Sequence, residues 1–283
     1  MVDLKKLLAA AALVTVLAAP AFAHTAFMKP NDFYPAADRV VVQSAWATQF
    51  FTAAIGLGQQ SFKVIGPDGG ASSFIGFDVS AQDAHLEAGL PVRGTYRVTT
   101  GEVLGPITPL VSDGVGGWRP LGQGETPPEG ETTTSVQTVT VAESYVTRGV
   151  PNRTAVDAPG GRLAIHPITH PNQILLSTGF QLTLMLDGAP MPNVAVVLYG
   201  AGDPETKQDH YVTTDASGNA TLTFDQPGQY VVAARYRGAA PADAGVAIRS
   251  YTTTLTVDVM TALPPAPPPE RPGRARRDRS RLY

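Results

Sequence analysis

The chain has 283 residues, 43% hydrophobic and 16% charged, which is the balance of a globular protein long enough for two domains. It has no cysteine, which excludes disulfide bonds, thiolate metal ligands and a cysteine nucleophile, so a bound metal would have nitrogen and oxygen ligands. The formal net charge is −3 although residues 270–283 carry six arginines against two acidic residues. The rest of the chain is therefore acidic, which disfavours nucleic acid as a partner.

The first 23 residues have the pattern of a cleavable secretory signal peptide. Lys5 and Lys6 precede an apolar run over residues 7–19, and small residues follow at Ala21 and Ala23. This run is too short to span a bilayer, and no later stretch reaches the length that a spanning helix needs. We therefore expect signal peptide 1–23 to direct the protein to the periplasm, and the mature protein to have no transmembrane segment.

Cleavage after Ala23 would leave His24 as the first residue of the mature protein. Its α-amine and its imidazole Nδ1 could then chelate one metal ion in a six-membered ring. Imidazole is a ligand that suits copper, nickel, cobalt and zinc. The sequence therefore makes His24 a candidate metal ligand.

The body of the chain reads as strands and turns, and no stretch shows a convincing amphipathic helix. Alternating and β-branched segments predict strands, and Asp-Gly and Gly-Pro-rich segments predict the turns between them. The segment 114–131, rich in Gly and Pro, is expected to form a loop. Predicted strands occupy residues 39–46, 62–65, 94–100 and 132–147 in the first half, and 162–167, 180–186, 195–199, 210–214, 220–224, 228–236 and 252–259 in the second.

Regular short strands with turn signals predict an all-β fold of two tandem immunoglobulin-like β-sandwich domains. The first would span residues 24–147 and the second residues 162–260, joined by a linker over 148–161 that is rich in Pro and Gly. Residues 261–283, a polyproline run followed by arginines, are expected to form a disordered tail, because neither segment can bury a core.

Several motifs together resemble a family of exported bacterial proteins with an uncharacterised domain. The resemblance implies a non-enzymatic, metal-linked role, because its members are often described as periplasmic components of cobalt or nickel uptake systems. A membrane transporter or an outer-membrane receptor is then the expected partner. The motifs occupy residues 66–69, 94–97, 141–149, 165–172, 186–194, 214–220 and 227–230, together with His24 after the signal.

The first domain is also similar to small periplasmic copper-resistance proteins of the C type. Those proteins begin with a histidine and carry an Asp-x-His motif late in the domain, as Asp83-Ala84-His85 does here. The similarity implies a metal site formed by His24, Asp83 and His85. Two imidazoles, an amine and a carboxylate suit a tetragonal site for Cu(II) or Ni(II).

Other interpretations remain open at the level of sequence. His166 and His170 have the spacing of a metal pair, but residues four apart on a strand are about 13 Å apart, so a strand-end and a loop histidine are favoured. The sequence lacks common enzyme motifs, and we expect no enzyme. Two alternatives are a copper-dependent oxidase with an N-terminal histidine brace, in which His85 would be the second histidine, and a cell-envelope or receptor-associated adaptor that binds no metal.

Overall fold

The computed structural model describes residues 24–58, 62–122 and 124–265, and their fold is all-β, as predicted. The helix in this part of the chain is the single turn α1 (Thr154–Asp157), which lies inside the segment predicted as a linker. The predicted signal peptide 1–23 and most of the predicted tail, residues 266–283, lie outside the described residues.

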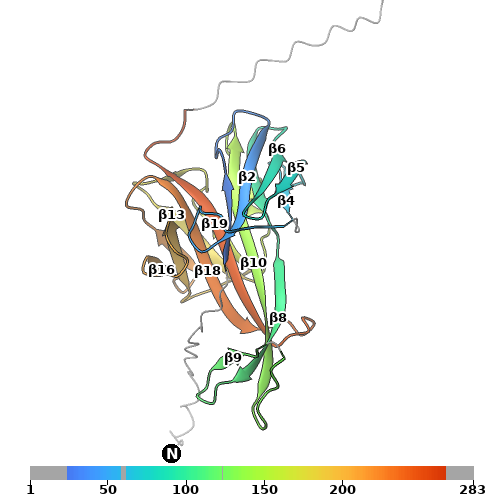
Figure 1. The fold of residues 1–283 in the computed structure, drawn as a ribbon. Coiled ribbons are helices and arrows are strands. Elements are labelled where there is room, and N and C mark those ends of the chain that lie inside the picture. The colour runs from blue at the N-terminus through green and yellow to red at the C-terminus, as the bar shows by residue number, and fades with distance from the viewer. Residues whose placement is uncertain (1–23, 59–61, 123, 266–283) are drawn as a thin grey trace, which may run out of the picture.

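A five-stranded antiparallel sheet forms the first layer, in the order β1-β2-β6-β5 with β3 paired to β2 (Figure 1). β1 is almost wholly buried because its alternate side chains enter two different cores: Ala26 and Met28 enter one and Phe27 the other. The strands are β1 (Thr25–Pro30), β2 (Arg39–Ala47), β3 (Ile55–Gly56), β5 (Phe74–Val79) and β6 (Ala84–Gly89).

A ten-stranded sheet runs through both halves of the chain, with a central order of β16-β15-β18-β19-β10-β7-β4. Its two central strands, β10 and β19, come from different halves and pair in parallel, from Val136 opposite Ile248 to Ser144 opposite Thr256. The strands are β4 (Lys63–Ile65), β7 (Gly94–Thr99), β8 (Val103–Ser112), β9 (Trp118–Pro120), β10 (Thr133–Arg148), β12 (Ile174–Leu175), β15 (Ala195–Gly200), β16 (Tyr211–Thr213), β18 (Gly228–Ala239) and β19 (Ile248–Met260).

A four-stranded sheet lies against the other face of this central sheet. Its order is β11-β13-β14, with β17 paired to β13. The tight turn between β13 and β14 places Asp187 and Gly188 at positive φ angles, as the Asp-Gly pair predicts for a two-residue hairpin. The strands are β11 (Leu163–Pro167), β13 (Phe180–Leu186), β14 (Ala189–Pro190) and β17 (Asn219–Leu222).

The central sheet is shared by two sandwiches, and β10 shows why. Val139 and Tyr145 of β10 pack with the four-stranded sheet, whereas Ala142 and Val146 pack with the five-stranded sheet. A strand covered on both faces is apolar or small at nearly every position, which explains the unbroken burial of β10 over its second half. The two predicted sandwiches are thus joined through one continuous sheet.

The predicted strands are confirmed to within a few residues at each end in both halves of the chain. The segment 114–131 differs from the prediction, because Trp118–Pro120 forms β9 and pairs with β8. The β8–β9 hairpin and the first part of β10 extend beyond the body of the molecule as an arm (Figure 1). Within the described ranges, no helix is long and apolar enough to cross a membrane.

Candidate functional site

Asp83 and His85 form a close pair on the five-stranded sheet. His85 Nε2 lies 3.1 Å from Asp83 Oδ2, which also accepts a hydrogen bond of 2.9 Å from Gln43 Nε2 on the neighbouring strand. Ser80 Oγ donates to the second carboxylate oxygen over 2.7 Å. The hydrogen bonds from Gln43 and then Ser80 hold the pKa of Asp83 below its usual value, so a charged carboxylate is fixed beside an exposed imidazole.

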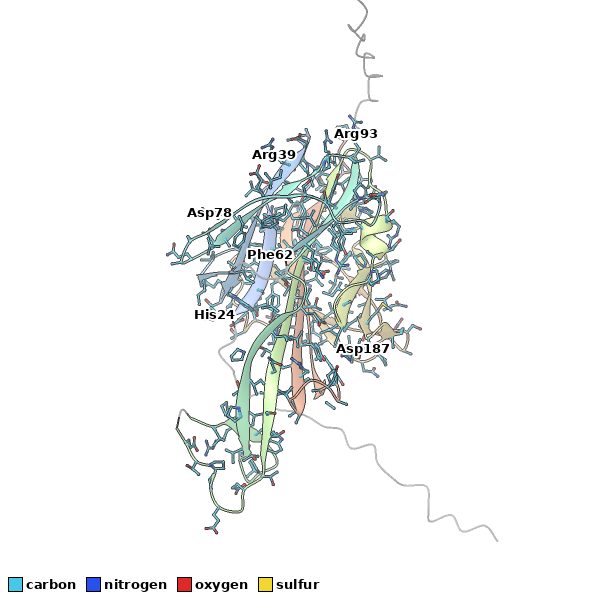
Figure 2. The ribbon with its side chains drawn as sticks, turned by 90° about the vertical axis from the view of Figure 1, so that its right-hand side faces the viewer. His24, Arg39, Phe62, Asp78, Arg93 and Asp187 are labelled. Atoms are coloured by element: carbon cyan, nitrogen blue, oxygen red, sulfur yellow. The ribbon has the colours of Figure 1, made fainter. Side chains whose placement is uncertain are left out.

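His24 immediately precedes β1, at the end of the strand that is labelled in Figure 2. The strand register places Gln43 of β2 opposite both Lys29 of β1 and His85 of β6. Because His24 precedes Lys29 by five residues, it is about 17 Å along the strands and about 10 Å across them from His85.

The structure therefore brings Asp83 and His85 together and does not bring His24 to them. In the part of the chain that the structure describes, no three His, Asp or Glu side chains are grouped so that they could hold a metal ion. The site of His24, Asp83 and His85 implied by the copper-resistance likeness is not formed here. Because of the same separation, His85 does not serve as the second histidine of an N-terminal histidine brace with His24.

The surroundings of His24 are defined by its neighbour Thr25, which is buried. Thr25 Oγ1 donates a hydrogen bond of 2.5 Å to Glu205 Oε2 and accepts one of 3.0 Å from Arg235 Nη2. The second guanidinium nitrogen of Arg235 donates to the Tyr199 hydroxyl, which in turn donates to the Glu205 carbonyl. These four side chains form a closed polar cluster around the first residue of β1.

The imidazole of His24 has no hydrogen bond, ion pair or ring contact to any other residue within the described ranges. It is half-buried and precedes a strand that is fixed in the core on both sides. The ring is thus available to a ligand at a position that the fold holds in place.

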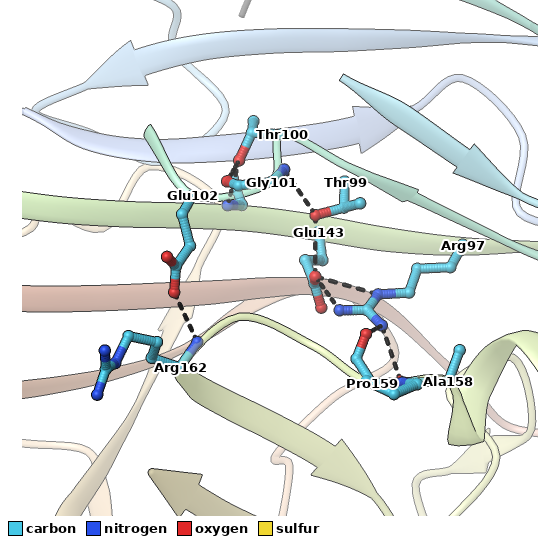
Figure 3. A network of polar contacts seen from close by, with 10 residues as sticks. Arg97, Thr99, Thr100, Gly101, Glu102, Glu143, Ala158, Pro159 and Arg162 are labelled. Atoms are coloured by element: carbon cyan, nitrogen blue, oxygen red, sulfur yellow. Dashed lines mark hydrogen bonds and ion pairs between the residues drawn. The ribbon is translucent and has the colours of Figure 1, made fainter. Parts of the chain in front are cut away.

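A second polar network, which sequence reasoning missed, lies where the two halves of the chain meet (Figure 3). The buried side chains of Arg97 on β7 and Glu143 on β10 form an ion pair, and Thr99 Oγ1 donates to the same carboxylate oxygen over 2.9 Å. Arg97 Nη1 donates to the carbonyl oxygens of Ala158 and Pro159, each over 3.0 Å.

Residues 159–161 line two cavities, one of about 380 Å³ that is also lined by Tyr145 and His166 and one of about 490 Å³ that is also lined by Lys63 and Glu102. Four of the five N–H groups of Arg97 are used within the protein, so this guanidinium holds the 158–161 segment and offers little to an anion.

His166 and His170 lie in different surroundings, as the strand geometry predicts. His170 is buried, its Nδ1 accepts a hydrogen bond from the Asn172 amide, and its Nε2 lies 3.0 Å from the Asn152 carbonyl oxygen. Both ring nitrogens of His170 are therefore occupied. His166 Nε2 lies 3.9 Å from Asp157 Oδ1 at the surface.

The profile of the family described as a domain of unknown function (DUF4198) matches residues 21–238. The chain belongs to this family. The matched residues include His24, the Asp83–His85 pair and the polar cluster around Thr25, whereas β19 lies beyond the match. The DUF4198 description states no activity.

No curated protein matches this DUF4198 member. Among solved structures, the D0-D1 domain of Intimin aligns with 83% of this chain and 97% of its own at 13% identity and a TM-score of 0.21. A similarity of that size supports no conclusion about function.

Proposed function

We propose that the protein is an exported, non-enzymatic protein that binds a divalent transition metal ion, nickel, cobalt or copper, and delivers it to a membrane transporter or outer-membrane receptor. The ion would be chelated by the α-amine and imidazole of His24 in the mature periplasmic protein. The observation that carries the proposal is the free imidazole of His24 at the head of a strand fixed between two cores.

The donor chemistry fits such an ion. A terminal amine and an imidazole are nitrogen donors of the type that Cu(II), Ni(II) and Co(II) bind well. Because β1 is anchored through Thr25, the two nitrogens are presented at one place on the molecule. A chelate at a fixed terminus loses less conformational entropy on binding than one on a flexible tail.

The experiment compares metal binding by protein that begins at His24 with binding by the same protein acetylated at its α-amine. Calorimetric titration with Ni(II) and Cu(II) should give one tight site in the first protein and a loss of about tenfold or more in the second, since acetylation converts the amine to an amide and leaves no terminal amine. His85→Ala in the first protein should leave this tight site unchanged. Equal affinity with and without the acetyl group would contradict the proposal.

A second function is favoured by the β8–β9 arm, which carries exposed apolar side chains. Leu104, Ile107 and Val115 are 55%, 53% and 89% exposed. Exposed apolar residues on one projecting element are typical of contact surfaces for a partner. If the protein is an envelope adaptor that uses this arm and no metal, the titrations will show no stoichiometric ion.

A further inference from the structure

We propose that Glu205 supplies a carboxylate ligand to the metal ion chelated by His24, an inference that rests on the proposed function. Glu205 lies in the loop between β15 and β16, about 180 residues from His24 in sequence, and no motif in the chain connects the two. Their proximity is a consequence of the fold alone.

Glu205 contacts Thr25, the residue that follows His24, and Thr48, the residue that follows β2. Its carboxylate Oε2 lies 2.5 Å from the hydroxyl of Thr25, the next residue in the chain. Its own N–H donates over 2.8 Å to the carbonyl oxygen of Thr48. Thr25 pairs with Ala47, the residue before Thr48, so Glu205 contacts β1 and the segment after β2 where their pairing ends. The Glu205 carboxylate therefore lies at Thr25, one residue from the position of the mature amine.

The second carboxylate oxygen of Glu205 is available to a ligand. Oε2 accepts the Thr25 hydroxyl, whereas Oε1 receives no hydrogen bond or ion pair from any residue in the described ranges. Glu205 is half-buried, so part of its hydration has already been lost on folding. A half-desolvated carboxylate oxygen without a donor is a favourable partner for a cation.

The loop that carries Glu205 is fixed against residues 48–50, which follow β2. Phe50 N–H donates to the Asp203 carbonyl over 3.0 Å, and Gly202 N–H donates back to the Phe50 carbonyl over 3.0 Å. The Tyr199 hydroxyl holds the Glu205 carbonyl from the other side over 3.1 Å. The carboxylate is thus positioned before any ion arrives, which lowers the entropic cost of binding.

The resulting donor set is an amine nitrogen, an imidazole nitrogen and a carboxylate oxygen, a combination suited to Ni(II) or Cu(II). Arg235 is the nearby positive charge, and its guanidinium nitrogens already donate to Thr25 and Tyr199. In a Glu205→Gln protein the Arg235 charge would face the ion without a compensating carboxylate. Removing the Glu205 charge should therefore weaken binding by more than the loss of one ligand alone.

The test uses the mature chain beginning at His24, with Ni(II) and Cu(II) as probes. Calorimetry should show that Glu205→Gln lowers the affinity by about tenfold to a hundredfold, and the visible spectrum of the Cu(II) form should shift as the carboxylate ligand is lost. Asp83→Asn, which removes the same charge from the five-stranded sheet, should change neither. Thermal unfolding without metal confirms that both variants are folded.

The outcomes separate this inference from the proposed function. If acetylation of the α-amine abolishes tight binding and Glu205→Gln leaves affinity and spectrum unchanged, the amine chelate stands and Glu205 is not a ligand. If Glu205→Gln tightens binding, its carboxylate competes with the ion for the α-ammonium, and the inference is again overturned. If neither change affects binding, the proposed function itself fails.

Discussion

Replacing Arg97 by methionine tests how far the buried ion pair between β7 and β10, with its hydrogen bonds to the 158–161 segment, stabilises the fold. The Arg97 and Glu143 side chains are 4% and 7% exposed. The substitution leaves the Glu143 carboxylate in the interior with the Thr99 hydroxyl as its remaining donor, and frees the carbonyl oxygens of Ala158 and Pro159. Breaking one side of a buried ion pair costs about 3–5 kcal/mol, so the free energy of unfolding should fall by that amount.

The reciprocal variant and the double variant isolate the pairwise interaction. Glu143→Leu leaves the Arg97 charge buried and should also cost about 3–5 kcal/mol. Arg97→Met/Glu143→Leu removes both charges, so it should be more stable than the sum of the single effects predicts by about 2 kcal/mol. The measurement is urea unfolding at pH 7 followed by two spectroscopic probes, since coincident transitions are needed for a free energy.

Arg39→Met is the matched control, because the Arg39–Glu87 pair is exposed, with side-chain exposures of 58% and 32%. It should cost less than about 1 kcal/mol. Single effects at Arg97 and Glu143 that add to within about 0.5 kcal/mol of the double variant would refute the reasoning. The network would then be two independent sets of hydrogen bonds rather than one unit.

Two further predictions concern the folded scaffold. Burial lowers the pKa of His170, and its Nδ1 accepts a hydrogen bond from the Asn172 amide, so the ring is neutral in the folded protein. The free energy of unfolding should therefore fall as the pH drops below about 6.5. Urea midpoints measured from pH 7.5 to 5 should fall less steeply in His170→Gln than in the parent, and an equal slope would contradict this. Gly94→Ala should lower the free energy of unfolding by about 3 kcal/mol or more, because φ is +143° and the new Cβ would lie 2.3 Å from the Pro67 side chain. Gly188→Ala, at φ +78° with nothing within 4 Å of its new Cβ, should lower it by about 1–2 kcal/mol in the same chemical unfolding experiment. Equal costs would exclude the contact with Pro67 as the cause.

The strands that could be predicted are those whose side chains reveal their periodicity or composition. The Thr/Val run of β10 and the alternation of side chains in β2 indicate strands directly, and the Asp187-Gly188 pair predicts the hairpin between β13 and β14. β1 could not be recognised in this way, because both of its faces are buried and its polar residues, Thr25 and Lys29, do not alternate regularly with apolar ones. β6 is rich in Ala and Gly, residues with weak strand propensity, although its His85 and Leu86 alternate between exposed and buried.

The candidate site was predictable only where it is local. Asp83 and His85 lie close together because residues two apart on a strand share a face, which the Asp-x-His spacing already implies. The separation of His85 from His24 depends on the register of two strand pairs, and a sequence without a known register does not specify it. Glu205 could not be found at all, because its contact with Thr25 results from a loop of one sandwich packing on the edge strand of the other.

The contacts at His24 and at the Asp83–His85 pair predict which of these two candidate positions binds a metal ion more tightly. At His24 the α-amine and the imidazole nitrogen belong to one residue and would form one chelate ring. Glu205, whose loop backbone is held by four hydrogen bonds, would add a carboxylate. At the Asp83–His85 pair two donors face solvent, and the carboxylate already accepts from Gln43 and Ser80, hydrogen bonds that a metal would have to displace. Fewer donors and an existing set of hydrogen bonds both reduce the net free energy of binding. Limiting metal should therefore occupy the terminus first, and any second equivalent at Asp83 and His85 should bind more weakly and be lost in His85→Ala without affecting the first.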